Sequence, residues 1–169
     1  MDRGILIDLD IVALSDLILS KQAFCSDSQI LNFYFQTQVS QDEKKELTKC
    51  FVLINKKLEK IIGYYTLSAT SINVADIPIS RIKKQIRYPM IPAALIGRLA
   101  IDRNFTRQGF GKFLIADAIS KVREAKLGIA ALLVEAKDIK AVEFYKKLGF
   151  IQFMDKQDTL FLPLTKLIK

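Results

Sequence analysis

The chain has 169 residues, is 50% hydrophobic, and carries 26 Lys and Arg against 18 Asp and Glu, for a net charge of +8. Its length suits one domain with a sizeable core, and the positive charge favours acidic partners such as nucleic acid or nucleotides. Histidine is absent, which excludes Ser-His-Asp and Cys-His catalysis and histidine metal ligands. Proton transfer therefore has to use tyrosine, carboxylate, lysine, cysteine or water, and we expect no metal site.

The composition also indicates a cellular setting. The start of the chain, Met1-Asp2-Arg3-Gly4, has no signal-peptide pattern, and the apolar stretches are too short to span a membrane. Cys25 and Cys50 are far apart and form no Cys-x-x-Cys pair, which fits a reducing compartment. We therefore expect a cytoplasmic protein without membrane contact.

The first part of the chain predicts one strand and two helices. Residues 5–7 are a short apolar strand, and residues 15–22 form one or two helical turns with Ser15 as the N-cap. A longer helix is expected over 27–39. The apolar face of that helix consists of Ile30, Phe33, Tyr34 and Val39.

A β-hairpin and a short basic helix come next. The two strands cover 50–54 and 60–74, where Ile, Tyr and Thr are frequent, and Lys56-Lys57 belongs to the turn between them. The basic helix is expected over 78–87 and ends before Pro89, because the residue before a proline is restricted to extended conformations.

Strands and helices alternate in the second half of the chain. We expect a strand over 93–101, a helix over 109–126 that Gly128 ends, a strand over 129–134, a helix from Asp138 to Leu148 that Gly149 ends, and final strands over 150–153 and 160–162. This order predicts an α/β (α+β) fold, in which helices flank a mixed, mostly antiparallel sheet of six or seven strands. We expect a single domain over 1–169.

The most informative segment is 98–112, where an apolar strand, a basic loop and two glycines precede an amphipathic helix. Gly109 and Gly111 lack Cβ, so their backbone N–H groups can approach a ligand closely. The helix N-terminus adds unsatisfied N–H donors and a partial positive charge. The segment therefore predicts an anion cradle, and a pyrophosphate is its natural ligand.

The segment has alternative interpretations: it could bind one of several phosphate-containing ligands, or it could have a purely structural role. A P-loop needs Gly-x-x-x-x-Gly-Lys-Ser/Thr, which the chain lacks. A dinucleotide fingerprint needs a third glycine where Leu114 stands, although Glu135 follows at about the distance of a ribose-binding acid. A glycine-rich turn that only caps an ordinary helix is the structural alternative.

Two motifs resemble the GNAT superfamily of N-acetyltransferases. Residues 106–111, Thr-Arg-Gln-Gly-Phe-Gly, resemble its acetyl-CoA loop, Arg/Gln-x-x-Gly-x-Gly/Ala, with Thr106 at the position usually held by Gln or Arg. Residues 138–150 resemble its Asn-x-x-Ala-x-x-Phe-Tyr motif followed by Gly-Phe, with Asp138 in place of Asn. The expected order of strands and helices is also the GNAT order.

A narrower resemblance is to the GNAT toxins of bacterial toxin–antitoxin pairs. It rests on the strings at 62–69, 95–102 and 134–138, and on the region that begins with Phe24-x-Ser26. That family often carries His at the position of Glu135.

The resemblance implies that acetyl-CoA is the co-substrate. Backbone groups of Leu99, Ala100 and Ile101 then hold its pantetheine arm, and Tyr145 protonates the leaving thiolate. A phenol with a reference pKa of about 10 is protonated at neutral pH, as a general acid must be. The other implied coenzyme-binding residues are Arg107, Gln108, Gly109, Phe110, Gly111, Lys112 and Asp138.

The toxin resemblance further implies a reaction and partners. The reaction is acetylation of the α-amino group of an aminoacyl-tRNA, which blocks translation. The implied partners are a ribbon-helix-helix antitoxin, operator DNA reached only through that antitoxin, and a second copy of the chain in a homodimer.

A basic stretch gives the tRNA interpretation a binding surface. Residues 77–101 contain no acidic residue, although charge runs are often just solvated helix faces. The predicted tRNA contacts are Arg81, Lys83, Lys84, Arg87 and Arg98.

No strong general base stands out in the sequence. Glu135 is a candidate, with a structural ion pair as its alternative role. Because an α-amino group titrates near pH 8, against about 10.4 for lysine, water could remove its proton without a side-chain base. Two other functions stay open: a GNAT enzyme acting on a small amine or a protein N-terminus, and a coenzyme-A-binding co-repressor that acts with a DNA-binding antitoxin.

Overall fold

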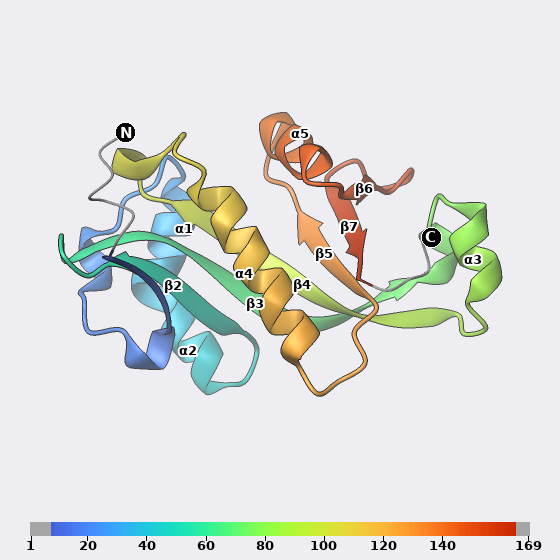
Figure 1. The fold of residues 1–169 in the computed structure, drawn as a ribbon, viewed down its shortest axis with the longest axis horizontal. Coiled ribbons are helices and arrows are strands. Elements are labelled where there is room, and N and C mark those ends of the chain that lie inside the picture. The colour runs from blue at the N-terminus through green and yellow to red at the C-terminus, as the bar shows by residue number, and fades with distance from the viewer. Residues whose placement is uncertain (1–7, 165–169) are drawn as a thin grey trace. The chain divides into compact units, whose positions relative to one another are not determined.

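A computed structural model describes residues 8–164 and contains a seven-stranded sheet in the order β1-β2-β3-β4-β5-β7-β6 (Figure 1). The predicted strand at 5–7 lies outside the described residues. Four described pairs, β1–β2, β2–β3, β5–β7 and β6–β7, are antiparallel, and β4 runs parallel to β5. The predicted mixed, mostly antiparallel sheet flanked by helices is confirmed. The strands are β1 Leu9–Ala13, β2 Lys49–Asn55, β3 Lys60–Asn73, β4 Met90–Ile101, β5 Ala131–Glu135, β6 Ile151–Gln152 and β7 Thr159–Pro163.

Five α-helices accompany the sheet within the described part of the chain: α1 Gln29–Phe33, α2 Val39–Lys44, α3 Ser80–Gln85, α4 Phe110–Glu124 and α5 Ile139–Lys147. A π-helical turn, Tyr34–Gln38, joins α1 to α2. None of the helices in 8–164 is long and apolar enough to cross a membrane.

The described residues divide into two compact units. The first contains 8–67 and 98–117, and the second contains 68–97 and 118–164. Strands β3 and β4 and helix α4 contribute residues to both units.

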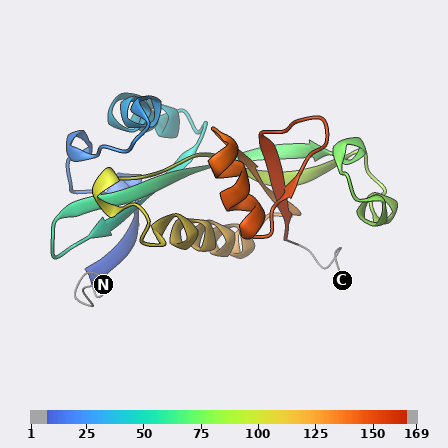
Figure 2. The ribbon, with the colours of Figure 1, turned by 90° about the horizontal axis from the view of Figure 1, so that it is seen from above.

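In the first unit, helices cover both faces of β3 (Figure 2). Neighbouring residues of a strand point to opposite faces, and Tyr64 and Tyr65 use this alternation. Tyr64 stacks on Phe35 with ring centroids 4.3 Å apart and donates its hydroxyl to the carbonyl oxygen of Leu31 at 2.8 Å. Tyr65 donates to a carboxylate oxygen of Asp117 in α4 at 2.5 Å. The α1 side and the α4 side of β3 are thus each fastened by one phenol.

The helix expected over 15–22 is wrong. The chain instead forms two 3-10 turns, Leu14–Asp16 and Lys21–Ala23, and the hydroxyl of Ser20, not Ser15, caps the second by accepting the N–H of Gln22. Both Leu17 and Leu19 pack against the core, and residues two apart in a helix would lie on different faces. An irregular segment satisfies both contacts.

The helix expected over 27–39 exists, but half of its predicted apolar face is wrong. It begins at Gln29 with Ser28 as the N-cap and continues through the π turn to Lys44. Tyr34 and Val39 are buried as predicted, whereas Ile30 and Phe33 are 81% and 59% exposed. The π turn adds a residue to one turn, so the consecutive Tyr34 and Phe35 both face inward.

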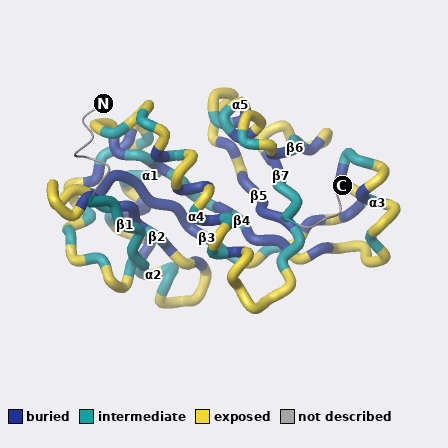
Figure 3. The backbone as a smooth tube through the Cα atoms, viewed as in Figure 1, coloured by how far each residue is buried: buried dark blue, intermediate teal, exposed yellow. Residues whose placement is uncertain are grey.

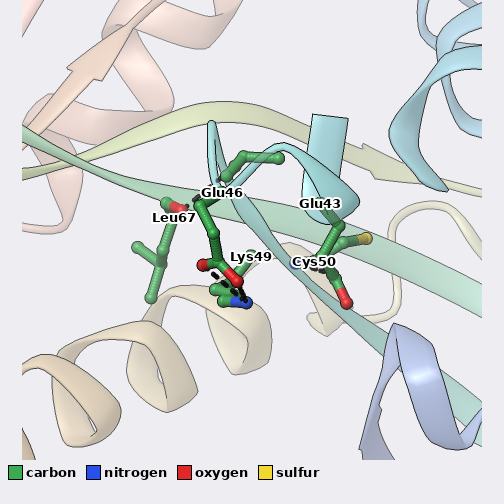
Figure 4. A network of polar contacts seen from close by, with 6 residues as sticks. Glu43, Glu46, Lys49, Cys50 and Leu67 are labelled. Carbon is green, nitrogen blue, oxygen red and sulfur yellow. Dashed lines mark hydrogen bonds and ion pairs between the residues drawn. The ribbon is translucent and has the colours of Figure 1, made fainter. Parts of the chain in front are cut away.

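Polar contacts fix the turn from α2 into β2 (Figure 4). A carboxylate oxygen of Glu43 accepts the N–H of Cys50 at 2.9 Å, and the ammonium of Lys49 lies 3.0 Å from the carboxylate of Glu46. The hydroxyl of Thr48 donates to the carbonyl of Leu67 on β3 at 3.0 Å. These bonds set the start of the β2–β3 hairpin, whose strands and turn at 56–57 are confirmed.

The second unit contains the rest of β3 and β4, the parallel β4–β5 pair, β7 and β6, with α5 beside them. Its buried core includes Ile72, Ile82, Leu133, Phe153 and Phe161. Figure 3 shows β5 buried along most of its length. The predicted helix 78–87 is confirmed as α3, which is held by Ile82, 2% exposed, in this core.

Of the two predicted helix-ending glycines, one is confirmed. Gly149 has φ +94° and follows α5 directly, as a C-terminal glycine does. Gly128 does not end α4: the helix stops at Glu124, and Gly128 has no positive φ. Leu127 is 78% exposed, so no apolar contact favours extending the helix to Gly128.

Gly63 is a glycine with no room for a side chain. A Cβ at Gly63 would lie 2.7 Å from the carbonyl oxygen of Ala100 and 2.7 Å from Cδ1 of Ile101. We predict that Gly63→Ala lowers the free energy of unfolding by about 1–3 kcal/mol, because backbone has to move, as measured by urea denaturation. Gly128→Ala is the matched control, since a Cβ there meets nothing within 4 Å. Equal stabilities of the two variants would contradict this packing.

Candidate active site

The loop between β4 and α4 leaves the sheet at a buried carboxylate. Asp102 is 4% exposed, and its two carboxylate oxygens accept the N–H groups of Cys25 at 2.9 Å and Asn104 at 3.0 Å. Its own N–H donates to the carbonyl of Ile62 at 2.8 Å. These bonds fix where the chain leaves β4 and begins the predicted anion cradle.

The cradle itself turns through two left-handed residues. Arg107 has φ +60° and Gly109 has φ +84°, directly before α4 begins at Phe110. The first N–H groups of a helix lack intrahelical acceptors, and the helix dipole makes this end positive. With the exposed side chains of Arg107 and Lys112 alongside, the residues present fit a pyrophosphate.

Phe110 has a buried side chain, so only its backbone is available to the predicted cradle. Its side chain is 4% exposed, and its ring lies edge-on to Phe105 with centroids 6.3 Å apart. The ring therefore anchors the first turn of α4, while Gln108 and Gly111 are half-buried beside it in the chain.

The strand end that precedes the loop carries the predicted pantetheine contacts. Ala100 is buried in the core of the first unit, and Leu99 and Ile101 are half-buried. Ile101 lies near Leu114, since both would touch a Cβ at Gly63. By strand alternation, Ala100 and Arg98 share the opposite face, toward α1.

Arg98 is stacked on an aromatic ring. Its guanidinium carbon lies 3.5 Å from the ring centroid of Tyr34, and its backbone N–H donates to the hydroxyl of Thr66 at 3.0 Å. Tyr34 in turn donates to a carboxylate oxygen of Asp42 at 3.0 Å, and burial together with this bond raises the pKa of Tyr34 to about 12. Sequence reasoning placed Tyr34 on the apolar face of its helix but missed its contact with Arg98. It also missed Asp42 and Thr66, because no local pattern links them to Arg98.

In the second unit, the residues of the Asp138–Phe150 motif have distinct roles. The carboxylate of Asp138 is the N-cap of α5 and accepts the N–H of Ala141 at 2.8 Å. Tyr145 is 7% exposed and lies between Phe144 and Phe150, with ring centroids 5.2 and 5.3 Å away. Burial raises the pKa of Tyr145 to about 12, so its hydroxyl is protonated at neutral pH.

The hydroxyl of Tyr145 differs from those of the other buried tyrosines. Three of the five tyrosines, Tyr34, Tyr64 and Tyr65, donate to acceptors of the protein, and Tyr88 is 74% exposed. Within residues 8–164, the Tyr145 hydroxyl has no hydrogen-bond acceptor. Since none of the fully buried side-chain oxygens in this part of the chain lacks a partner, the Tyr145 hydroxyl reaches the surface, where its proton is available for a ligand.

The other predicted polar residues divide between the two units. Glu135 ends β5 with an exposed side chain, and no ion pair to it occurs among residues 8–164. Arg81, Lys84 and Arg87 are exposed on and after α3, whereas Lys83 donates to the carbonyl of Ala75 at 2.8 Å. The described residues contain no group of three metal-ligating side chains.

Residues 22–167 match the family model described as an acetyltransferase (GNAT) domain. The chain belongs to the GNAT family. A "tRNA-acetylating toxin" of Mycobacterium tuberculosis is 30% identical over 130 residues, which cover 76% of each chain.

Two solved structures resemble the chain over nearly its whole length. AtaT complexed with acetyl-methionyl-tRNAfMet is 34% identical, with a TM-score of 0.86, over 92% of this chain and 95% of that one. An AtaT mutant bound to acetyl-CoA and the C-terminus of the antitoxin AtaR is 31% identical, with a TM-score of 0.80, over 95% and 96%. The sequence-based resemblance to GNAT enzymes is confirmed.

The role of the Asp138 carboxylate as the N-cap of α5 can be tested by substitution. We predict that Asp138→Ala lowers the free energy of unfolding by about 1 kcal/mol, because it removes the N-cap of α5, whereas Asp138→Asn keeps the cap and the stability. Urea denaturation of both variants measures this difference. Unchanged stability of Asp138→Ala would contradict the cap.

Proposed function

We propose that this protein is the toxin of a type II toxin–antitoxin system, which transfers the acetyl group of acetyl-CoA to the α-amino group of aminoacyl-tRNA and so inhibits translation. The observation that carries the proposal is the free, protonated hydroxyl of Tyr145 in a GNAT chain that also has an anion cradle at α4. The tRNA-acetylating relative and the tRNA-bound AtaT support aminoacyl-tRNA as the acceptor.

The cradle has the task of holding the coenzyme. The backbone N–H groups at 109–112, with the cations of Arg107 and Lys112, bind the pyrophosphate. Leu99, Ala100 and Ile101 bind the pantetheine arm through their backbone. Gln108 and Asp138 complete the proposed coenzyme contacts, and acetyl-CoA supplies the thioester that the amine attacks.

Tyr145 has the task of the general acid. The neutral amine forms a bond to the acetyl carbon, the carbon–sulfur bond breaks, and Tyr145 gives its hydroxyl proton to the thiolate of coenzyme A. The thiolate, whose conjugate thiol has a reference pKa of about 8.5, is a weaker base than the phenolate of Tyr145, so the transfer is uphill by itself. It therefore takes place together with cleavage of the C–S bond, and solvent then returns a proton to the phenolate. Water takes the amine proton, since an α-amino group titrates near pH 8 and about half of it is neutral there.

The partners of this enzyme follow from the same proposal. They are a ribbon-helix-helix antitoxin, operator DNA contacted only through that antitoxin, and a second copy of the chain in a homodimer. The AtaT structure bound to the C-terminus of the antitoxin AtaR supports an antitoxin as partner. We further propose that residues 1–169 act as one domain and that the protein works in the cytoplasm.

The catalytic role is tested with Tyr145→Phe. We predict that it lowers kcat by about 100-fold or more, which is the usual contribution of a general acid, while the Kd for acetyl-CoA stays within about twofold. Transfer of label from acetyl-CoA to a charged total tRNA pool measures kcat. Tyr88→Phe, which removes an exposed phenol hydroxyl, is the matched control. Full activity of Tyr145→Phe would refute the assignment of Tyr145 as the general acid. If the wild-type enzyme transferred label only to small amines or protein N-termini, the tRNA substrate would be refuted.

The basic helix α3 is tested by charge reversal. We predict that Arg81→Glu with Lys84→Glu raises the apparent KM for tRNA by roughly tenfold at low salt and flattens its salt dependence, because two phosphate contacts are lost. Lys45→Glu with Lys57→Glu makes the same change of charge at exposed positions outside the proposed surface. If the two pairs give the same KM, the stretch that includes α3 is a solvated face and does not bind tRNA.

A further inference from the structure

The stack of Arg98 on Tyr34 begins with an irregular helix. Tyr34 is the first residue of the π turn between α1 and α2, and a π turn in a helix is frequently a functional feature. The turn buries Tyr34 and Phe35 together, at 2% and 0% exposure. Phe35 packs on Tyr64, which leaves the ring of Tyr34 as the surface on which Arg98 lies.

Arg98 is held at its backbone and at one face. Thr66 accepts its backbone N–H, and the Tyr34 ring lies 3.5 Å below the guanidinium carbon. Tyr34 is in turn fixed by its bond to Asp42. The side chain thus has little freedom left to lose on binding a ligand.

The N–H groups of this guanidinium are unused. No residue in 8–164 accepts a hydrogen bond from the Arg98 side chain or forms an ion pair with it, although Arg98 is half-buried. The half-buried guanidinium therefore keeps its donors available for an anionic ligand. The contact with the Tyr34 ring uses the face of the guanidinium and none of its N–H donors, and these donors form the fork geometry that fits a phosphate.

The phosphate in question is not the pyrophosphate at the cradle. Arg98 precedes the Leu99–Ile101 segment, and Asp102 follows it on the way to the cradle. Four strand residues span about 13 Å, so the proposed pantetheine segment separates Arg98 from the loop. The side chain also lies on the α1 face with Ala100, away from the α4 face of Ile101.

We propose that Arg98 binds a phosphodiester of the acceptor end of tRNA, and that Tyr34 is a positioning residue for this contact through its ring. The inference rests on the proposed function and assigns it a specific acceptor-binding group. A carboxylate of an acidic protein segment is the competing ligand for the same fork.

Direct binding tests the contact independently of catalysis. Fluorescence anisotropy with a labelled, uncharged total tRNA pool, measured over a salt series, gives the Kd of each variant. We expect Arg98→Gln to weaken binding about tenfold at low salt and to reduce the slope of log Kd against log salt by about 1, as for one lost phosphate contact. Arg98→Lys, which keeps the charge but not the fork, should recover only part of the affinity.

The role of Tyr34 in positioning Arg98 is tested with a matched pair of variants. Tyr34→Leu removes the ring under Arg98, whereas Phe35→Leu removes a neighbouring ring of the same core that stacks on Tyr64 instead. We expect Tyr34→Leu to weaken tRNA binding at least threefold more than Phe35→Leu at comparable Tm. Tyr34→Phe keeps the ring and should stay within about twofold of wild type. Equal Kd values for Tyr34→Leu and Phe35→Leu would overturn the positioning role.

A phosphate-free acceptor separates the phosphate contact from other roles. With wild type and Arg98→Gln, KM is compared for charged tRNA and for an amino acid ethyl ester. We expect Arg98→Gln to raise KM for the tRNA and not for the ester. An equal rise for both, or wild-type tRNA affinity in Arg98→Gln, would overturn the proposal. The wild-type protein could fail to acetylate charged tRNA while Arg98→Gln still binds tRNA more weakly than wild type does. In that case the proposed reaction is wrong and the phosphate site stands.

Discussion

Two adjacent phenols of β3 hold the first unit together, and the anion cradle depends on them. Tyr64 fastens the α1 side to one face of the strand and Tyr65 fastens α4 to the other. Each hydroxyl is withdrawn from water and given an acceptor, which a buried polar group requires. Helix α4, at whose start the cradle lies, is thereby fixed at Asp117 against one face of β3, and the helices that carry Tyr34 and Phe35 pack on the other face.

Burial has opposite chemical consequences for the tyrosines of this protein. It raises the pKa of Tyr34, Tyr64, Tyr65 and Tyr145, so that all four stay protonated at neutral pH. The hydroxyls of the first three donate hydrogen bonds to acceptors of the protein, so these phenols stabilise the fold. Tyr145 has the same raised pKa without an acceptor among the described residues, and so can serve as an acid.

The protein offers two ways to bind a phosphate, and they differ in what positions the donors. At the cradle, the left-handed Arg107 and Gly109 orient backbone N–H groups at the helix N-terminus. At Arg98, an aromatic ring and a backbone bond orient a side chain. The first arrangement is local in sequence, and the second joins residues 64 positions apart.

Periodicity and local turn chemistry determined much of this protein. They predict the hairpin, α3, the Asp138 cap, the turn at Gly149 and the strand–loop–helix order of the cradle, because each depends on residues close together in sequence. Tertiary packing decided the rest. The π turn exposes Phe33 and buries Phe35. The core contacts of Leu17 and Leu19 favour two 3-10 turns over a helix. The free hydroxyl of Tyr145 is recognised only once the acceptors of the other tyrosines are known. Such features are set by distant neighbours that compete for the same core volume and the same hydrogen bonds, which a local pattern does not encode.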